Sequence, residues 1–254
     1  MSVIGCFLKA VAQLPDPRLR RVLWIGVLGS VAIFIVLWAG LWWSMSAVAW
    51  TEIWGIGWLI DWFGGIAQWV AGMVFLSSVM FATLVLFPAV ITIIVGFFLE
   101  DVVNAVEARH YSGQPAARPQ PASEVLATTV KFALMVIALN VLFLPVYLVL
   151  FFVPPLNLVL YYVLNGYLVS REYYELVALR RLAPRPARRL RRAHRGRVLL
   201  AGIVVVFIMT IPVVNLIAPV LATAFMVHVF QNLPRRREFM AAEAAGVGAP
   251  SEIA

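Results

Sequence analysis

The sequence has little charge and almost no cysteine. Only 13% of its 254 residues are charged, whereas 63% are hydrophobic. A soluble domain has about a quarter charged residues, so this composition excludes an ordinary soluble domain and predicts a protein with several membrane-spanning segments. The single cysteine, Cys6, excludes an internal disulfide and a thiol-rich metal site.

Signatures of catalysis are also missing. The sequence contains no His-Glu-x-x-His, no Gly-x-Ser-x-Gly and no Walker motif, and no pair of acids lies on an apolar face in a catalytic arrangement. We therefore expect a protein that is not an enzyme, has no metal or cofactor, and drives no transport with ATP hydrolysis of its own.

The net charge of +8 would suggest nucleic acid as a partner in a soluble chain. Beside apolar spans, basic loops instead follow from the positive-inside rule, and they attract anionic lipid headgroups. We expect anionic lipids, and no nucleic acid, as partners.

The first third of the chain predicts an N-terminus in the cytoplasm. Residues 1–17 have apolar positions at helical spacing, which indicates an amphipathic helix on the membrane surface. Residues 18–43 form the first long helix, with an uncharged stretch from Val22 to Trp43 that is long enough to cross a bilayer. Residues 44–67 are rich in tryptophan and contain no lysine or arginine, which is typical of the outer interface.

A second long helix is predicted over residues 68–110. It would cross the membrane, bend at Pro88, where a backbone hydrogen bond is lost, and continue into the cytoplasm through an acidic extension. A proline-rich polar loop follows it.

The remaining apolar segments are predicted to form two helical hairpins, over 123–179 and 198–232. Between them, 180–197 carries nine arginines and no acid, which indicates a cytoplasmic surface helix. Each hairpin must therefore leave and return to the cytoplasmic side, and most arms are too short to cross fully. A full crossing by the longer first arm stays open. Residues 233–254 are expected to form a flexible tail, so both termini would be cytoplasmic.

The same pattern, Pro-x-x-Asn-Leu, occurs in the middle of each hairpin, at Pro154 with Asn157 and at Pro212 with Asn215. Proline can end one helix and open the next at its first position, and the asparagine can bond free backbone groups at a buried turn. The motif predicts the hairpin tips. Whether the asparagines also face a passing anion stays open.

Two interpretations apply to Arg20 and Arg21 at the start of the first long helix. They can be topology anchors. Alternatively they can bind an oxyanion, because free N–H groups and the helix dipole favour an anion there and guanidinium forks match its oxygens.

Three stretches resemble the CysZ family of bacterial inner-membrane sulfate permeases, which belongs to a wider family with the etoposide-induced membrane proteins. "RLRRVLWIGVLGS" is similar to the family's Gly-(Ile/Leu)-Arg-Arg helix entry, although Arg18 replaces the glycine before Leu19. "FPAVITIIVGFFLEDVVNAVEARHYSG" is similar to its second long helix, and "TIPVVNLIAPVLATAFMVH" to its Ile-Pro-Leu-x-Asn-Leu hairpin. The first tip departs from the family's Pro-Gly-Ile-Gly.

The resemblance implies an all-α integral membrane protein with two long transmembrane helices, two partially inserted, re-entrant hairpins and amphipathic surface helices. It also implies a homo-oligomer in the bacterial inner membrane that imports sulfate for cysteine biosynthesis, with an anion site at Arg18, Leu19, Arg20 and Arg21. The alternative is a protein that organises the membrane without transport and binds anionic lipid through its hairpins and arginine-rich helix.

Overall fold

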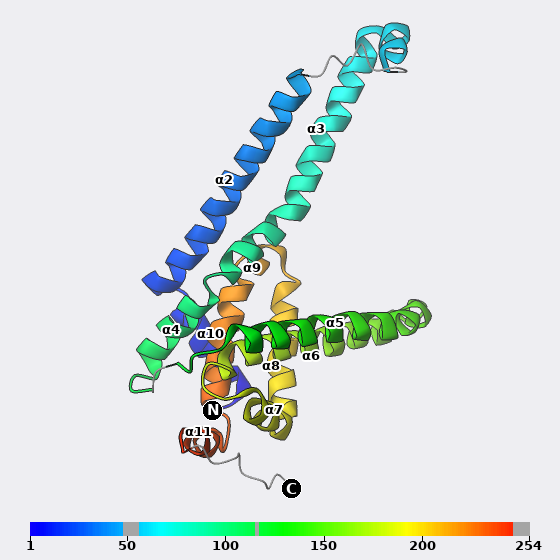
Figure 1. Ribbon diagram of the computed structural model, residues 1–254. Coiled ribbons are helices and arrows are strands. Elements are labelled where there is room, and N and C mark those ends of the chain that lie inside the picture. The colour runs from blue at the N-terminus through cyan, green and yellow to red at the C-terminus, as the bar shows by residue number, and fades with distance from the viewer. Residues whose placement is uncertain (48–55, 115–116, 246–254) are drawn as a thin grey trace. The chain divides into compact units, whose positions relative to one another are not determined.

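The structure is a computed structural model that describes residues 1–47, 56–114 and 117–245. Every regular element in these ranges is an α-helix (Figure 1). The helices are α1 (Val3–Gln13), α2 (Pro17–Ala47), α3 (Ile56–Gly96), α4 (Leu99–His110), α5 (Ala122–Leu150), α6 (Pro154–Ala178), α7 (Pro184–Ala193), α8 (Arg195–Met209), α9 (Pro212–Asn215), α10 (Ala218–Gln231) and α11 (Arg236–Ala244).

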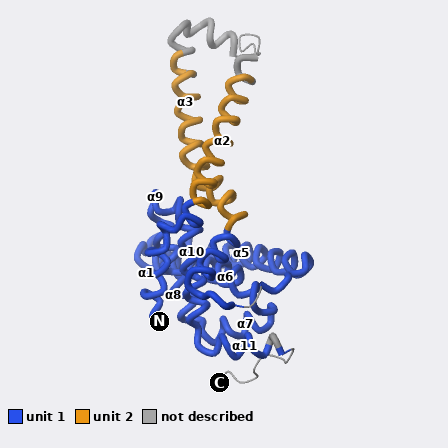
Figure 2. Tube along the Cα trace, turned by 90° about the vertical axis from the view of Figure 1, so that its left-hand side faces the viewer, with its two compact units in different colours: residues 1–20, 99–254 blue, residues 21–98 orange. Residues whose placement is uncertain are grey.

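The chain forms two compact units, coloured separately in Figure 2. The first comprises residues 1–20 and 99–254, and the second comprises residues 21–98. Three helices in the described ranges are long and apolar enough to cross a membrane, over Pro17–Trp43, Gly72–Gly96 and Ala122–Leu150. The protein is therefore an all-helical membrane protein. The partial insertion of the hairpins remains a prediction.

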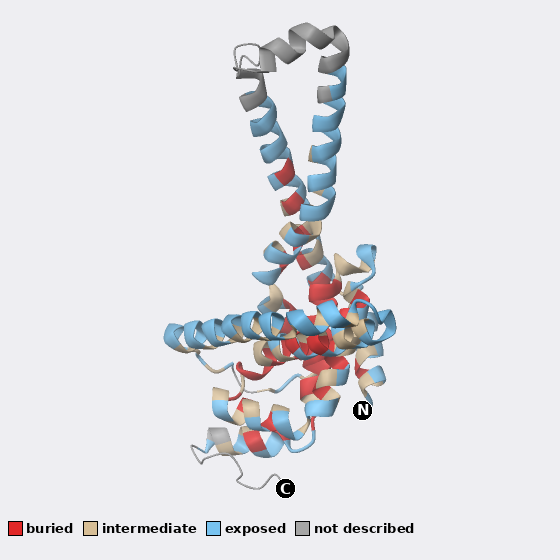
Figure 3. Ribbon diagram, turned by 90° about the vertical axis from the view of Figure 1, so that its right-hand side faces the viewer, coloured by how far each residue is buried: buried red, intermediate tan, exposed pale blue. Residues whose placement is uncertain are grey.

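The second unit contains most of α2 and α3, which touch along a narrow strip. Gly26 lies against Val95, since a Cβ at this glycine would be 2.6 Å from a Val95 methyl carbon. Further along, the Phe34 and Phe87 rings are 5.7 Å apart, and the Trp38 Nε1 donates to the Thr83 Oγ1 at 3.1 Å. Most other described side chains of these helices are exposed and apolar, as expected of surfaces that face lipid (Figure 3).

The predicted helix over 68–110 is not continuous. The first part, α3, begins earlier, at Ile56, and ends at Gly96, and α4 starts at Leu99. In the turn, the Phe97 and Phe98 amides bond carbonyl oxygens three residues back, which tightens the last turn and ends the helix. Pro88 lies inside α3, so the break falls about nine residues after it.

The core of the first unit surrounds α10. Every residue of this helix from Ala218 to Phe230 is buried, and it contacts α1, α4, α6 and α8. Phe7 of α1 meets Phe225 edge to face at 5.5 Å between ring centres, and Tyr174 of α6 meets Phe230 at 5.9 Å. The second hairpin thus has one arm inside protein and the other, α8, against α6.

The amphipathic helix predicted over 1–17 corresponds to α1, which packs on α10 through Phe7 and a row of other side chains. Cys6 and Ala10 are buried, as is Gln13, at 1% exposure. Ile4 and Leu8, two large apolar residues of this helix, are exposed. The short residues pack on α10 because they let the helices approach closely, which leaves the larger apolar residues on the outer surface.

The first hairpin consists of α5 and α6, with a turn over 151–153, and the second of α8, α9 and α10. No residue of α5 is buried, so this helix carries only the pale blue of exposed and the tan of intermediate residues in Figure 3. Within 180–197, Pro184–Ala193 form α7, which buries Ala187 and Leu190; the cytoplasmic surface position of this helix stays a prediction.

Two further predictions need correction. The tail predicted from 233 contains a helix, α11, in which Phe239 is buried; residues 246–254 lie outside the described residues. The tryptophan-rich segment over 44–67 lies outside them from 48 to 55, and its second half is the start of α3.

Candidate anion-binding site

The predicted anion-binding residues lie in the first turns of α2. Leu19 is fully buried, whereas Arg18, Arg20 and Arg21 are exposed. Successive residues of a helix point about 100° apart, so burial of Leu19 fixes the rotation of this turn and leaves the arginines on its outer side. Neither Arg20 nor Arg21 forms an ion pair with a carboxylate in the described ranges.

Asp16 precedes this helix and was missed from the sequence. Its Oδ1 accepts a hydrogen bond from the Arg18 amide at 2.9 Å, and its Oδ2 forms a 2.9 Å ion pair with the Arg109 Nη1. The signal was the Asp-Pro pair, because aspartate is a favoured N-cap and proline a favoured first residue. The carboxylate occupies part of the helix end, so an added oxyanion would depend chiefly on the guanidinium groups of Arg20 and Arg21.

The ionisation state of Asp16 agrees with its position as the N-cap of α2 and the partner of Arg109. Partial burial by itself would raise its pKa, but the hydrogen bond from the Arg18 amide and the charge of Arg109 outweigh burial and lower the pKa. Asp16 is therefore a fixed negative charge at neutral pH. It compensates Arg109 and the helix dipole and leaves the positive charge of Arg20 and Arg21 uncompensated.

The prolines of the two tips lie where the motif predicts. Pro154 opens α6 and Pro212 opens α9, each in the first turn. The residues at the N-caps of these helices, Val153 and Ile211, make no side-chain cap hydrogen bond, and the role expected of the asparagines stays a prediction. The chain satisfies these turns itself, with the Asn157 amide bonded to the Val153 oxygen and the Asn215 amide to the Ile211 oxygen. Both asparagines are half-buried.

The structure does not bring the two tips together within one chain. The hairpins meet where α6 crosses α8, and Figure 1 shows the turn between α5 and α6 far from α9. The crossing is built on two glycines: a Cβ at Gly166 would lie 2.6 Å from the Ile203 side chain, and Gly202 faces the Gly166 carbonyl oxygen. A shared path at both tips would require contact between different chains.

A buried polar network beside α10 was also missed. His228 is fully buried, and its Nδ1 lies 2.8 Å from the Tyr111 hydroxyl. Asn232 donates to the same hydroxyl and to the His228 carbonyl oxygen. Burial raises the pKa of Tyr111, so its hydroxyl stays protonated and can donate. These bonds fasten the end of α4 to α10.

An ion pair between Glu107 and Arg181 ties α4 to the segment before α7. The Arg181 Nη2 lies 2.6 Å from the Glu107 Oε2, and the two side chains are only 5% and 8% exposed. The Gln231 Nε2 donates to the other carboxylate oxygen at 3.2 Å. This pair holds the beginning of the arginine-rich segment against the core.

Replacing Glu107 with glutamine is expected to lower the free energy of unfolding by about 3–5 kcal/mol, because the substitution removes the buried carboxylate charge and leaves the charge of Arg181 in place. The thermal midpoint of the detergent-solubilised protein measures the loss. Glu238→Gln is the matched control, since Glu238 pairs with Arg235 at the surface and its loss should cost less than about 1 kcal/mol. Equal effects of the two substitutions would contradict the anchoring role.

Comparison with known proteins gives one family. The family model described as Sulfate transporter CysZ/Etoposide-induced protein 2.4 matches residues 6–219. The match begins in α1 and extends into α10, so it includes the arginines of α2 and both tips. None of the curated proteins and none of the solved structures compared with the chain matches it.

Proposed function

Because the chain belongs to the Sulfate transporter CysZ/Etoposide-induced protein 2.4 family, we propose that it is a permease or channel for a small oxyanion, sulfate, in the bacterial inner membrane. The family match over residues 6–219 is the observation that carries the proposal. Imported sulfate would supply cysteine biosynthesis. Both termini would lie in the cytoplasm, as the basic segments near them favour.

The arginines of α2 would bind the anion at the mouth of the pathway. Arg20 and Arg21 are exposed and lack carboxylate partners in the described ranges, and buried Leu19 fixes the helix turn that presents them. A planar guanidinium group can donate two parallel hydrogen bonds to a tetrahedral oxyanion. Arg18, which replaces the family's glycine, adds a third positive charge at this turn.

The proposed path passes the tips at Pro154 with Asn157 and at Pro212 with Asn215. Since the tips of one chain lie apart, a path that uses both must form in a homo-oligomer. Phe151 and Phe152 are exposed in the turn between α5 and α6. They support contact between chains, because a large apolar surface there suits either lipid or a second chain.

A second candidate function is membrane organisation without transport. The observation that favours it is α7, where Ala187 and Leu190 are buried and Arg185, Arg189 and Arg192 are exposed. A helix of this kind can bind anionic headgroups along its outer face.

Uptake of labelled sulfate by vesicles reconstituted with the purified protein tests the proposal. We expect uptake above that of protein-free vesicles, reduced by excess unlabelled sulfate. Uptake equal to that of protein-free vesicles, from correctly inserted protein, would contradict transport. Vesicle deformation without sulfate uptake would favour the second candidate.

A further inference from the structure

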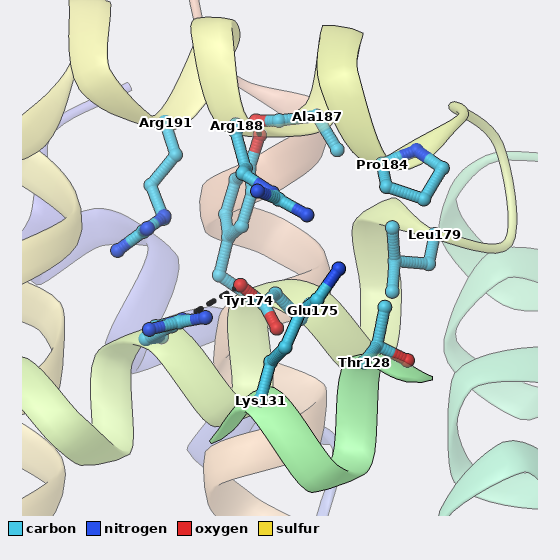
Figure 4. A pocket seen from close by; sticks show the side chains of 10 residues that line it. Thr128, Lys131, Tyr174, Glu175, Leu179, Pro184, Ala187, Arg188 and Arg191 are labelled. Carbon is cyan, nitrogen blue, oxygen red and sulfur yellow. Dashed lines mark hydrogen bonds and ion pairs between the residues drawn. The ribbon is translucent and has the colours of Figure 1, made fainter. Parts of the chain in front are cut away.

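A groove lined with positive charge lies between α5, α6 and α7. We call it the basic groove; Figure 4 shows its inner part. This narrow part has a volume of about 10 Å³, enough for an atom the size of a water oxygen. A wider, more open part of about 390 Å³ adjoins it and shares Thr128, Lys131, Pro184 and Arg188 with it.

Four cationic side chains and one carboxylate line the inner part of the groove. They are Lys131 of α5, Arg171 of α6, Arg188 and Arg191 of α7, and Glu175 of α6. The carboxylate is already engaged, because the Arg171 Nε lies 2.8 Å from the Glu175 Oε1. Glu124 in the wider part is likewise paired, with Arg118.

The remaining three cations therefore have no carboxylate partner in the described ranges. In Figure 4, Lys131 and Arg188 extend from opposite walls into the same space. The Arg191 guanidinium lies over the Tyr167 ring at 5.9 Å, and its Nε is buried with no hydrogen-bond partner. Like charges held around a small volume repel one another, and an anion in the groove would reverse this cost.

We propose that the basic groove binds a tetrahedral phosphate group, and that this phosphate is the headgroup of an anionic membrane lipid. Lys131 and Arg188 line both parts of the groove and would contact the oxygens of a phosphate in the wider part, while Arg191 in the narrow part would add positive charge behind them. Such charge-assisted hydrogen bonds are about twice as strong as neutral ones and favour phosphate over uncharged headgroups.

The surroundings of the groove favour a lipid over a free ion. Lys131 lies in α5, one of the three helices long and apolar enough to cross a membrane. Val130, Leu134 and Ile137, next to it on this helix, are exposed. Acyl chains can follow this apolar surface while the phosphate occupies the groove, so one molecule satisfies both the charge and the apolar contact.

Native mass spectrometry of the full-length protein in non-ionic detergent tests the proposal. The probes are phosphatidic acid and diacylglycerol with the same acyl chains, which differ only in the phosphate. We expect tighter binding of phosphatidic acid, and we expect Lys131→Gln with Arg188→Gln to weaken it about ten- to hundredfold. Lys131→Arg with Arg188→Lys, which keeps both charges, should restore most of the binding.

The matched control is Arg195→Gln with Arg237→Gln. These exposed arginines lie outside the groove and outside α7, so the control removes the same charge and should change binding less than about threefold. Equal weakening by both double variants, or equal affinity for the two lipids, would overturn the proposal. Loss of binding in the charge-conserving variant would also overturn it.

Competition by inorganic phosphate identifies the source of the ligand. Failure of millimolar inorganic phosphate to displace phosphatidic acid supports the lipid. Displacement that depends on Lys131 and Arg188 supports the same phosphate chemistry with a free ion as its source. The measurement involves no anion flux and leaves Arg20 and Arg21 unchanged, so its outcome is independent of the proposed transport.

Discussion

Replacing both Arg20 and Arg21 with alanine is expected to reduce sulfate uptake by reconstituted vesicles about a hundredfold at low sulfate concentration. A hydrogen bond to a charged group contributes about 1.5–3 kcal/mol, and the double variant removes two guanidinium groups that lack carboxylate partners in the described ranges. The initial rate of labelled sulfate uptake, normalised to the amount of inserted protein, measures the effect.

A lysine variant separates the two roles considered for these arginines. Arg20→Lys with Arg21→Lys keeps the positive charge that orients a helix but removes the planar fork that fits an oxyanion. If the arginines bind sulfate, uptake should stay well below that of the wild type although the protein inserts correctly. Wild-type uptake in the lysine variant would show that they serve only as topology anchors.

The charge control for this experiment is Arg192→Ala with Arg195→Ala. It removes two exposed positive charges from the arginine-rich segment. We expect its uptake to remain within about threefold of the wild type, because exposed charges at a distance are screened by salt. A fall as large as that of the Arg20 and Arg21 variant would contradict a local site on α2.

Replacing Gly202 with leucine is expected to prevent the first unit from folding. Even a Cβ at this position would overlap the Gly166 carbonyl oxygen and would lie 2.9 Å from the Ser170 backbone nitrogen. Because these atoms belong to the α6 backbone, no side-chain movement can relieve the overlap, and α6 and α8 must separate. Gly202→Ala should cost about 3 kcal/mol, at the upper end of overpacking penalties.

Gly196 supplies the matched control in the same helix, α8. A Cβ there would meet no atom within 4 Å, so Gly196→Leu should leave the fold intact and can stabilise the helix by up to about 1 kcal/mol. Elution as a single species from size exclusion in detergent, with the thermal midpoint, distinguishes the two variants. A monodisperse Gly202→Leu protein with a wild-type midpoint would contradict the close crossing.

Local sequence signals predicted the helices well where they depend on neighbours along the chain. Pro154 and Pro212 open helices as expected, because proline sets its own backbone angle and has no amide to satisfy. The arginine-rich segment contains a helix, α7, that begins with Pro184. The break after Gly96 was missed because residues 97 and 98 are apolar phenylalanines that continue the pattern of α3.

The candidate site could be predicted only in part, because some of its contacts join residues that are far apart in the sequence. The position of Arg20 and Arg21 at the start of a helix follows from the sequence. The pairing of Asp16 with Arg109 does not, because these residues are 93 positions apart and meet only in the folded chain. The Glu107 pair with Arg181 and the basic groove likewise depend on how helices distant in sequence approach one another.

The sequence by itself determined that this is an all-helical membrane protein of its family, because hydropathy, charge bias and helix-start residues are local properties. It did not distinguish helices that face lipid from helices that face protein. Apolar side chains are favourable in both environments, so α5 and α10 are both strongly apolar, yet α5 has no buried residue and α10 is buried from Ala218 to Phe230. Only the tertiary structure decided between them. Small residues let α1 pack closely on α10 and let α6 pack closely on α8, and these contacts enclose α10 but not α5.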